Sequence, residues 1–424
     1  MNSYTPKIYR AHEKGICVNA PASKSITNRA FLLAALSSKP VRLTGGALGE
    51  DTRAFAECLQ ALGIRIDEEE NAFTVYGCGG DIPVKNAALN VRSAGTAARF
   101  LTVALAFCGG DYTLDSSEQM RKRPMKELLD LLREAGVSVT CLREQDRFPF
   151  RLRSQGFQAD CVTVNTDKSS QFASALLLSA GVRKKPLTVA LTGARTQGSY
   201  LGITLNMLKA FHIPFQKKDN AITVFPAQDP PAEYAIEPDV SGACYFYALS
   251  LLCGETVTVA GVRQNNMQGD MQFLELLKEK GVRFFQTPQG LTADGSEISS
   301  YTGFDAVFTD FSDQTMTAAV LAAFAETPSV LRKVGHIRLQ ECDRIAAICE
   351  NLNALGAHAY SDGENIFITP APLHKGKVDP HGDHRVAMAF ALAGLKTGFV
   401  TVEDPLCCRK TFENYFDILE EITR

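Results

Sequence analysis

The sequence predicts an α/β fold built from six copies of one unit, and a repeated helix start is the main observation behind that prediction. Six helices that are apolar nearly all round recur at intervals of roughly 70 residues. Each begins with a serine or an aspartate, which can cap free backbone N–H groups. An all-apolar helix belongs inside a core, whereas its N-terminus carries free donors and attracts anions. The six starts are Ser25, Ser93, Ser169, Ser241, Asp313 and Asp383.

A second helix series alternates with the first and completes the unit. Its members are amphipathic and lead into short runs rich in β-branched residues, such as VTVNT and IFITP. Four of them stop at a glycine, typical of a left-handed helix end, and the third stops at His212. The glycines are Gly63, Gly136, Gly281 and Gly356. The unit is therefore strand, buried helix, strand, amphipathic helix, strand, strand.

Size and composition restrict the class of protein. A chain of 424 residues predicts two domains, and a net charge of −3 with 21% charged residues excludes a globally basic nucleic-acid binder. The start MNSYTPKIYRAHEKG shows no signal segment, and no apolar run is long enough for a bilayer, so no membrane association is expected. Twelve cysteines without a CxxC pair fit a reduced cytoplasm. The HxxH of His381 and His384 lacks further ligands, so no metal is expected.

The expected domain boundary lies in a proline-rich stretch, FPAQDPPAEYAIEPD. The segment before Ala20-Pro21 is a short strand candidate that could pair with either half.

Cations cluster at two helix starts. Lys24 lies beside the first helix N-terminus, where a cation costs energy unless an anion is bound there. Arg29 follows on the same face of the first turn and favours an anion site, although a surface lysine remains the alternative. Arg121, Lys122 and Arg123 precede a proline that opens a helix. They indicate either an anion site or a solvated charge run.

Polar residues at the third start suit a phosphate or a polyol. Ser169, Ser170 and Gln171 offer two hydroxyls and an amide in succession, all able to donate and accept hydrogen bonds. An ordinary helix cap is the alternative, for which one serine would suffice.

The last two repeats carry acids and arginines together. Asp313 opens an otherwise apolar helix, and Glu341 and Arg344 lie about one helical turn apart. Asp313 and Glu341 can form an acid/base pair, and arginines bind phosphates through two hydrogen bonds. A simple N-cap explains Asp383. The neighbouring motifs GDHRVAM and CCRKTF add His384, Arg385, Arg409 and Lys410.

These motifs together resemble one family over nearly the whole chain. KSITNRA, SAGTAAR, RPM, SSQF, ITLN, ECDR, DHRVAM and KTF occur in the order and spacing of the 5-enolpyruvylshikimate-3-phosphate (EPSP) synthases. The resemblance implies the enolpyruvyl transferase fold, an inside-out α/β barrel. In this fold, two similar domains each hold three βαβαββ units around a pseudo-threefold axis. Two crossover strands join the domains, which close around substrates bound in the cleft between them. For this chain the resemblance implies one discontinuous domain from residues 1–20 and 240–424 and a second from residues 21–239, with crossovers near residues 20–21 and 236–240.

The implied reaction makes two anionic small molecules the partners of the chain. The enolpyruvyl group of phosphoenolpyruvate (PEP) would pass to the 5-hydroxyl of shikimate 3-phosphate, with release of phosphate, on the route to chorismate and aromatic amino acids. The resemblance implies no metal and no organic cofactor, a cytoplasmic location and a monomer.

The resemblance also assigns residues. Binding of shikimate 3-phosphate falls to Lys24, Ser25, Arg29, Ser169, Ser170, Gln171, Tyr200, Asp313 and Gln340. Binding of PEP falls to Lys24, Gly95, Arg123, Gln171, Arg344, Arg385 and Lys410. The catalytic residues would be Asp313, Glu341 and Lys24. Asp313 would orient or deprotonate the attacking hydroxyl, and Glu341 would handle the proton at the PEP methylene carbon.

Four positions depart from the family pattern. Gln340 stands in place of a lysine, His336 in place of an asparagine, Ser93 where asparagine is common, and Gln197 in place of a frequent serine. Because Gln340 carries no charge, we expect weaker or more pH-sensitive binding of shikimate 3-phosphate. Gly95 has no side chain to crowd the PEP site, which predicts sensitivity to the PEP-site competitor glyphosate.

Two alternatives remain at this point. The UDP-N-acetylglucosamine enolpyruvyl transferases share the fold but carry a reactive cysteine before their Arg-Pro, and residues 114–125 contain none. An inactive anion-binding relative is the other alternative, and Gln340 alone favours it.

Overall fold

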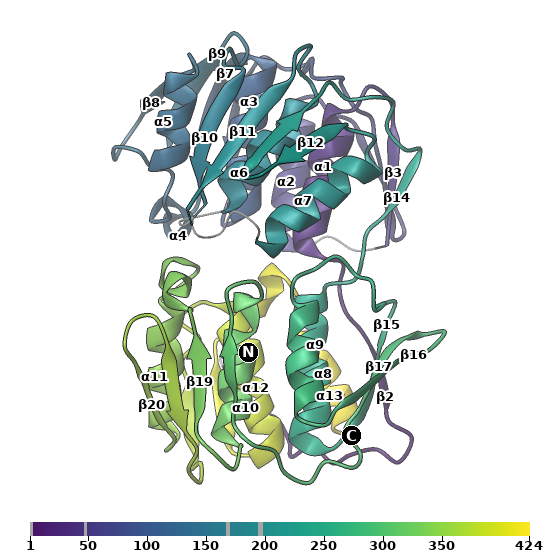
Figure 1. Ribbon diagram of the computed structural model, residues 1–424, viewed down its shortest axis with the longest axis vertical. Coiled ribbons are helices and arrows are strands. Elements are labelled where there is room, and N and C mark those ends of the chain that lie inside the picture. Colours follow the sequence, from purple (N-terminus) through teal and green to yellow (C-terminus); the bar gives the residue numbers. More distant parts are fainter. Residues whose placement is uncertain (1–2, 46–48, 167–169, 194–197) are drawn as a thin grey trace. The chain divides into compact units, whose positions relative to one another are not determined.

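The computed structural model describes residues 3–45, 49–166, 170–193 and 198–424, and the chain divides into two compact units (Figure 1). Unit 1 comprises Met1–Pro21 and Glu237–Arg424, and unit 2 comprises Ala22–Ile236. Each unit contains three repeats of the same pattern of strands and helices.

Unit 2 holds the first three repeats. The first consists of β14 (Glu233–Ala235), α1 (Lys24–Leu36), β3 (Val41–Thr44), α2 (Glu50–Ala61), β4 (Ile66–Glu69) and β5 (Ala72–Val75). The second consists of β6 (Asn86–Asn90), α3 (Gly95–Cys108), β7 (Gly110–Asp115), α4 (Glu118–Arg121), α5 (Lys126–Glu134), β8 (Ser138–Cys141) and β9 (Phe150–Ser154). The third consists of β10 (Cys161–Asn165), α6 (Ser170–Ala180), β11 (Leu187–Thr192), α7 (Ser199–Ala210), β12 (Phe215–Lys218) and β13 (Ala221–Val224).

Unit 1 holds the last three repeats. The fourth consists of β2 (Ile16–Asn19), α8 (Val240–Cys253), β15 (Thr256–Ala260), α9 (Met271–Glu279), β16 (Arg283–Gln286) and β17 (Gly290–Asp294). The fifth consists of β18 (Asp305–Val307), η1 (Ser312–Gln314), α10 (Thr315–Ala323), β19 (Ser329–Arg332), η2 (Gly335–Leu339), α11 (Arg344–Ala354), β20 (His358–Ser361) and β21 (Ile366–Thr369). The sixth consists of β22 (Gly376–Val378), α12 (His384–Thr397), β23 (Val400–Glu403), η3 (Pro405–Lys410), α13 (Tyr415–Ile422) and β1 (Ser3–Tyr4).

The same strand pairing recurs in all six sheets that the described residues form. The first two strands of each repeat are parallel, and the second strand pairs antiparallel with a third. Parallel neighbours need a crossover connection, which the buried helix supplies. The strand orders are β14-β3-β5-β4, β6-β7-β9-β8, β10-β11-β13-β12, β2-β15-β17-β16, β18-β19-β21-β20 and β22-β23-β1. This architecture confirms the α/β fold and the six-unit repeat.

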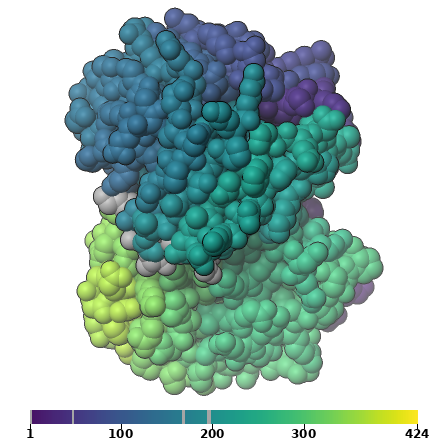
Figure 2. All heavy atoms as spheres, turned by 45° about the horizontal axis from the view of Figure 1, so that its top comes forward, coloured from purple at the N-terminus to yellow at the C-terminus, as the bar shows by residue number. Residues whose placement is uncertain are grey.

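The first strands of the first and fourth repeats are exchanged along the chain. Tyr234 of β14 pairs with Leu43 of β3, although almost 200 residues separate them. Val18 of β2 pairs with Val259 of β15, which answers the question of where the N-terminal strand candidate pairs. Purple atoms of this N-terminal segment accordingly lie at the edge of the green atoms of unit 1 (Figure 2).

A buried carboxylate also fastens the N-terminal segment to unit 1. Glu255, which is buried, accepts hydrogen bonds from the Tyr9 hydroxyl at 2.5 Å, the His12 backbone N–H at 2.8 Å and the Thr256 backbone N–H at 2.7 Å. The N-terminal segment has a second attachment to unit 1, because Ser3 and Tyr4 of β1 pair with Glu403 and Val402 of β23. The last sheet is therefore completed by the start of the chain.

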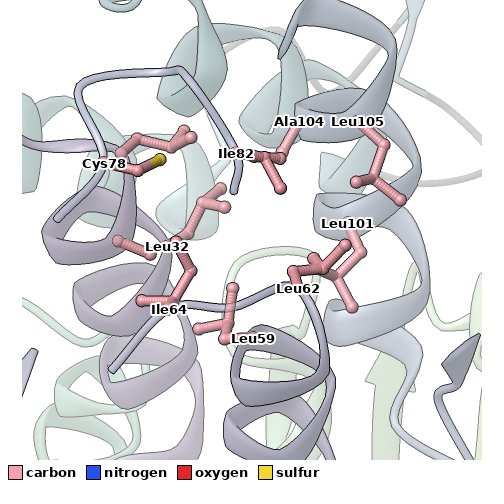
Figure 3. A pocket seen from close by; sticks show the side chains of 11 residues that line it. Leu32, Leu59, Leu62, Ile64, Cys78, Ile82, Leu101, Ala104 and Leu105 are labelled. Atoms are coloured by element: carbon pink, nitrogen blue, oxygen red, sulfur yellow. The ribbon is translucent and has the colours of Figure 1, made fainter. Parts of the chain in front are cut away.

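Each unit has its own core of three buried helices that pack against one another: α1, α3 and α6 in unit 2, and α8, α10 and α12 in unit 1. Apolar side chains from α1, α2 and α3, among them Leu32, Leu59 and Leu101, converge on a cavity of about 10 Å³ (Figure 3). A cavity of this size and lining is a small packing gap rather than a substrate site. None of the helices in the described ranges is both long and apolar enough to cross a membrane.

The helix ends confirm one prediction and correct another. The residues expected to end the amphipathic helices all have left-handed backbone, with φ of 55° at His212 and between 85° and 102° at the four glycines. Among the predicted N-caps that the structure describes, only Asp383 is right; its side chain accepts from the Arg385 N–H. Helix α1 starts after Ser23 and α8 after Asp239, so Ser25 and Ser241 lie within their helices. Ser93 bonds to the Ser117 hydroxyl instead of capping α3, and Ser169 lies outside the described residues.

Candidate active site

Arg344 of unit 1 is the centre of an ion-pair cluster. Its side chain is 1% exposed. Its guanidinium donates to Asp313 at 2.8 Å, to Asp383 at 2.7 Å and to Glu341 at 3.1 Å. Burial alone would lower the pKa of Arg344, but the charges of the three carboxylates reverse that effect and raise it. Arg344 therefore stays charged, and three acids are held around one cation.

Two further cations complete what we name the Arg344 cluster: Asp313, Glu341, Arg344, Asp383, Arg385 and Lys410. Arg385 Nη2 lies 3.0 Å from Asp313 Oδ2, and Lys410 Nζ lies 3.4 Å from Glu341 Oε1. Asp313 and Glu341 are thus each held between Arg344 and a second cation. Both candidate acid/base groups are nearly buried, with side chains 12% and 11% exposed.

Helix starts position this cluster. Arg344 is the first residue of α11, whose cap Asp343 accepts from the Ala346 N–H at 3.0 Å. Asp313 lies in the short η1 turn just before α10, and Arg385 is the second residue of α12. Since helix N-termini carry free N–H groups and partial positive charge, an anion placed here meets helix ends as well as side-chain cations.

Gln340 joins the cluster at its edge. It follows η2, and its side-chain oxygen accepts a hydrogen bond from Arg344. A lysine could not accept this bond, because an ammonium group only donates. The departure from the family pattern thus gives Arg344 an extra neutral partner. His336 lies within η2 in the same segment.

The counterpart in unit 2 is Arg29 of α1, which is also 1% exposed. Its guanidinium donates to the Thr204 hydroxyl at 2.9 Å, the Ser174 hydroxyl at 3.3 Å and the backbone oxygens of Ser25 and Tyr200 at 2.8 and 3.3 Å. Burial lowers the pKa of Arg29 to about 10. The described residues give this buried cation neutral oxygens as hydrogen-bond partners, so an anion beside it would be stabilised.

Arg29 gathers several of the residues predicted for shikimate 3-phosphate. Ser25 and Tyr200 contact it through their backbone oxygens, and Ser174 connects it to α6, which begins at Ser170. Ser170 and Gln171 are half-buried in the first turn of that helix. Ser169 and Gln197 lie outside the described residues.

Gly95 and Arg123 form a second contact in unit 2. Gly95 is the first residue of α3, and a Cβ placed on it would lie 2.6 Å from Arg123 Nη1 and 2.9 Å from Arg99 Nη1. Arg99 is buried and donates to the backbone oxygens of Gly95 and Pro124 at 3.0 and 3.1 Å. Two guanidinium groups thus lie against one helix N-terminus, and only glycine leaves room for them.

Lys24 and Arg121 have carboxylate partners that the sequence analysis did not foresee. Lys24 Nζ lies 3.0 Å from the buried Asp51 Oδ2, and Arg121 Nη2 lies 2.8 Å from Asp115 Oδ1. The charge run before the proline is therefore divided, with Arg121 in a local ion pair and Arg123 at Gly95.

These pairs add a feature that residue types alone did not indicate. The cations were expected to bind polyanionic substrates, and no partners within the chain were predicted for them. Lys24, Arg344, Arg385 and Lys410 each have a carboxylate partner within their own unit. An incoming anion must therefore share these cations with carboxylates already present.

Three functional candidates escaped the sequence analysis. Asp383 was assigned only a cap, but it also binds Arg344 through both carboxylate oxygens, at 2.7 and 3.3 Å. Asp51 lies in a helix with no motif of its own, whereas Arg99 ends the motif SAGTAAR but was given no role. Their charged side chains on mostly buried helix faces were the available signal. In the part of the chain that the structure describes, no three His, Cys, Asp or Glu side chains are grouped to hold a metal ion.

Solved structures place the fold in the enolpyruvyl transferase class. An EPSP synthase from Acinetobacter baumannii superposes with a TM-score of 0.81 at 21% sequence identity, covering 99% of this chain and 98% of that one. The enolpyruvyl transferase NikO from Streptomyces tendae superposes with a TM-score of 0.74 at 17% identity, covering 99% and 96%. The two units of three repeats are thus the enolpyruvyl transferase fold.

Sequence comparisons specify the family within that class. The model of the EPSP synthase (3-phosphoshikimate 1-carboxyvinyltransferase) family matches residues 14–419. The 3-phosphoshikimate 1-carboxyvinyltransferase of Trichormus variabilis is 35% identical over 403 residues, 94% of each chain, and that of Vibrio cholerae is 35% identical over 414 residues, 96% of each chain. The chain belongs to the EPSP synthase family.

Proposed function

We propose that this chain performs the reaction of its family with two sets of residues, one in each unit. The chain is a 3-phosphoshikimate 1-carboxyvinyltransferase of the shikimate pathway: it transfers the enolpyruvyl group of PEP to the 5-hydroxyl of shikimate 3-phosphate and releases phosphate. The observation that carries the residue assignment is the Arg344 cluster, in which two nearly buried acids are each held between two cations. Binding alone would not need such a pair of acids.

In the proposal, shikimate 3-phosphate binds in unit 2 around Arg29. Arg29 brings a buried positive charge with neutral partners, and this favours a carboxylate or phosphate. Ser170 and Gln171, at the start of α6, supply hydrogen-bonding groups to the phosphate, as does Ser169. Ser25, Tyr200 and Gln340 complete the set that the family resemblance assigns, and Lys24 contacts both substrates.

PEP would bind to arginines from both units. Arg123 and the α3 N-terminus at Gly95 offer donors in unit 2, while Arg344, Arg385 and Lys410 offer them in unit 1. Arginine suits this task because its planar group binds carboxylate or phosphate through two hydrogen bonds. Gln171 is assigned here as well. Because the reaction joins two substrates, both sets of residues must act on one pair of molecules.

The chemistry follows from the two acids. Glu341 passes a proton to the methylene carbon of PEP while Asp313 takes the proton of the 5-hydroxyl, and the new C–O bond gives a tetrahedral ketal. The roles then reverse: Glu341 recovers a proton from the methyl group, the C–O bond to phosphate breaks, and Asp313 returns its proton to the departing phosphate. Arg344 and Arg385 stabilise the negative charge of Asp313, and Lys24 and Lys410 stabilise the phosphate that leaves PEP.

We further propose that the chain acts in the cytoplasm as a monomer. Its twelve cysteines are all thiols, as expected for a protein of a reducing compartment. Some of the large apolar side chains that are exposed are far apart in sequence: Ile8 and Leu142 lie in loops, and Tyr360 lies in β20.

Phosphate release from PEP tests the function directly. Release that depends on shikimate 3-phosphate is the expected result. Release that depends instead on UDP-N-acetylglucosamine would identify the sister activity, and no release with either acceptor would identify an inactive anion-binding relative. Elution at the monomer mass in size-exclusion chromatography is expected, and a dimer mass would overturn the monomer proposal.

A further inference from the structure

A second buried carboxylate, Asp270, lies behind the η1 turn and has no part in the mechanism above. Asp270 immediately precedes α9 and is 6% exposed. Its Oδ1 accepts from Gln314 Nε2 at 2.8 Å, and its Oδ2 accepts from the Ser241 hydroxyl at 3.0 Å. One carboxylate thus connects the starts of α8 and α9 to η1.

Gln314 is the link between Asp270 and Asp313. It is fully buried and follows Asp313 directly in the chain. Its Nε2 also lies 3.4 Å from the Ser241 backbone oxygen, and its Oε1 accepts from the Thr317 hydroxyl at 3.1 Å. Both ends of the Gln314 side chain are therefore fixed, and with them the turn that presents Asp313 to Arg344 and Arg385.

Charge also connects the two carboxylates. Burial raises the pKa of Asp270 to about 6; the charge of Asp313 adds to the rise, whereas Arg385 and the Gln314 hydrogen bond oppose it. The groups that face Asp270 are Asp239, Ser241 and Cys244 of the α8 segment, Asp313 and Gln314 of η1, and Arg385 of α12.

We propose that Asp270 is a positioning residue for Asp313, acting through Gln314. This inference rests on the proposed role of Asp313 as the base. Asp270 holds η1 in place by accepting two hydrogen bonds, and its negative charge adds to the field at Asp313. Asp270 touches neither substrate in this scheme.

Asp270→Asn separates the charge from the hydrogen bonds. An asparagine oxygen can accept from Gln314, and its NH₂ group can donate to the Ser241 oxygen, so the turn keeps its connections. This variant should therefore keep kcat and both KM values within about twofold of the parent. Asp270→Leu loses both hydrogen bonds and should lower kcat by about tenfold or more, with both KM values nearly unchanged.

Gln314→Leu removes the link and retains a side chain of similar size. It should lower kcat by about tenfold or more and leave both KM values nearly unchanged, because only the presentation of the base is altered. Asp294→Leu is the matched control: Asp294 ends β17 and bonds to Arg283 and Thr256, so its loss should leave kcat and both KM values unchanged.

The outcomes are distinguishable. An Asp270→Leu variant with the kcat of the parent would overturn the inference, as would variants in which kcat, both KM values and the melting temperature deteriorate together. If Asp270→Leu does not fold, Gln314→Leu decides: unchanged kcat overturns the inference, and a selective loss of kcat supports it. A parent without release dependent on shikimate 3-phosphate would instead overturn the proposed function, and this inference with it.

Discussion

Arg29 of unit 2 and Arg344 of unit 1 are equally buried, yet their surroundings are opposite. Arg344 is surrounded by three carboxylates, which raise its pKa, whereas Arg29 donates to hydroxyl and backbone oxygens and has a pKa lowered to about 10. The two units share a fold, so the architecture does not impose the difference. It lies in the side chains that each repeat places beside its buried arginine.

The comparison shows two ways of using a buried cation. A charge without an opposite partner costs free energy in a protein interior, and a bound anion would relieve that cost. Arg29 is in this state and is suited to binding. Arg344 already has its counter-charges and is suited to holding acids in a fixed arrangement. The following experiments separate these two uses.

The largest effect should come from neutralising the paired arginine. Arg344→Gln leaves Asp313, Glu341 and Asp383 without their shared cation, and breaking a buried pair in this way typically costs about 3–5 kcal/mol. Arg29→Gln removes a charge with neutral partners and should change the free energy of unfolding by less than about 1 kcal/mol, while raising KM for shikimate 3-phosphate at least about tenfold. Urea denaturation and steady-state kinetics measure both. Equal destabilisation by the two substitutions would contradict the comparison.

Glu341→Gln tests whether the cluster is more than structural. The amide keeps the size and an oxygen for Arg344 or Lys410, but it cannot exchange a proton, so kcat should fall by about 100-fold or more. Glu350→Gln, at an exposed position on α11, is the control and should leave kcat unchanged. A near-normal rate for Glu341→Gln would remove this residue from the mechanism.

Asp270 is a buried acid that can be compared with the two buried arginines. Its effect should be seen in how the free energy of unfolding depends on pH. Its pKa is about 6 in the folded chain and 3.8 is the ordinary value. Between these values the folded state binds more protons than the unfolded state, so the free energy of unfolding should decrease as pH rises from about 4 to about 6. The decrease is about 3 kcal/mol at most, and Asp270→Asn should abolish this contribution. Unfolding curves with the same slope against pH in parent and variant would contradict it.

Gly95→Ala tests the contact of Arg123 with the start of α3 and changes no charged residue. The new methyl group would meet Arg123 at 2.6 Å, so this guanidinium must shift away from the α3 N-terminus. KM for PEP, and the inhibition constant for glyphosate if that competitor uses the same donors, should rise by about tenfold. Gly202→Ala on α7, where a Cβ meets no atom within 4 Å, is the control. Unchanged constants in Gly95→Ala would remove Arg123 from the PEP site.

The smallest effect should come from Gln340→Lys. A lysine restores a cation for the substrate phosphate but loses the hydrogen bond that Gln340 accepts from Arg344. These effects oppose each other, and we expect KM for shikimate 3-phosphate to fall by only about threefold. A Michaelis constant that does not change would mean that this position does not contact the substrate.

Much of the fold follows from the sequence, since the signals are local. The apolar helices, the β-branched runs and the left-handed helix ends at Gly63 and Gly136 depend on neighbouring residues. The pairing of β2 with β15 could not be deduced, because short strands of similar pattern fit either half. The start of α1 was misplaced because Ser25 and Ser23 are both suitable before an apolar run.

The site was predicted less completely, because it is formed by contacts between residues that are far apart in the sequence. That Asp313 and Glu341 could act as a pair was anticipated from residue types alone, whereas their shared contact with Arg344 was not. The contacts of Asp51 with Lys24 and of Asp383 with Arg344 were not predicted. A helix sequence does not reveal which acidic side chain will contact which basic side chain from another segment. The Gly95 contact with Arg123 depends likewise on the loop before α5.

The completion of the last sheet by β1 has a consequence for the order of folding during synthesis. Residues 22–236 leave the ribosome as a whole unit and can fold as soon as β14 emerges. The N-terminal segment is made earlier, but the partner of β1 is β23, near the other end of the chain. At ordinary rates of translation, β1 waits on the order of ten seconds or more after unit 2 is complete. One of the first strands to be synthesised is therefore among the last to pair.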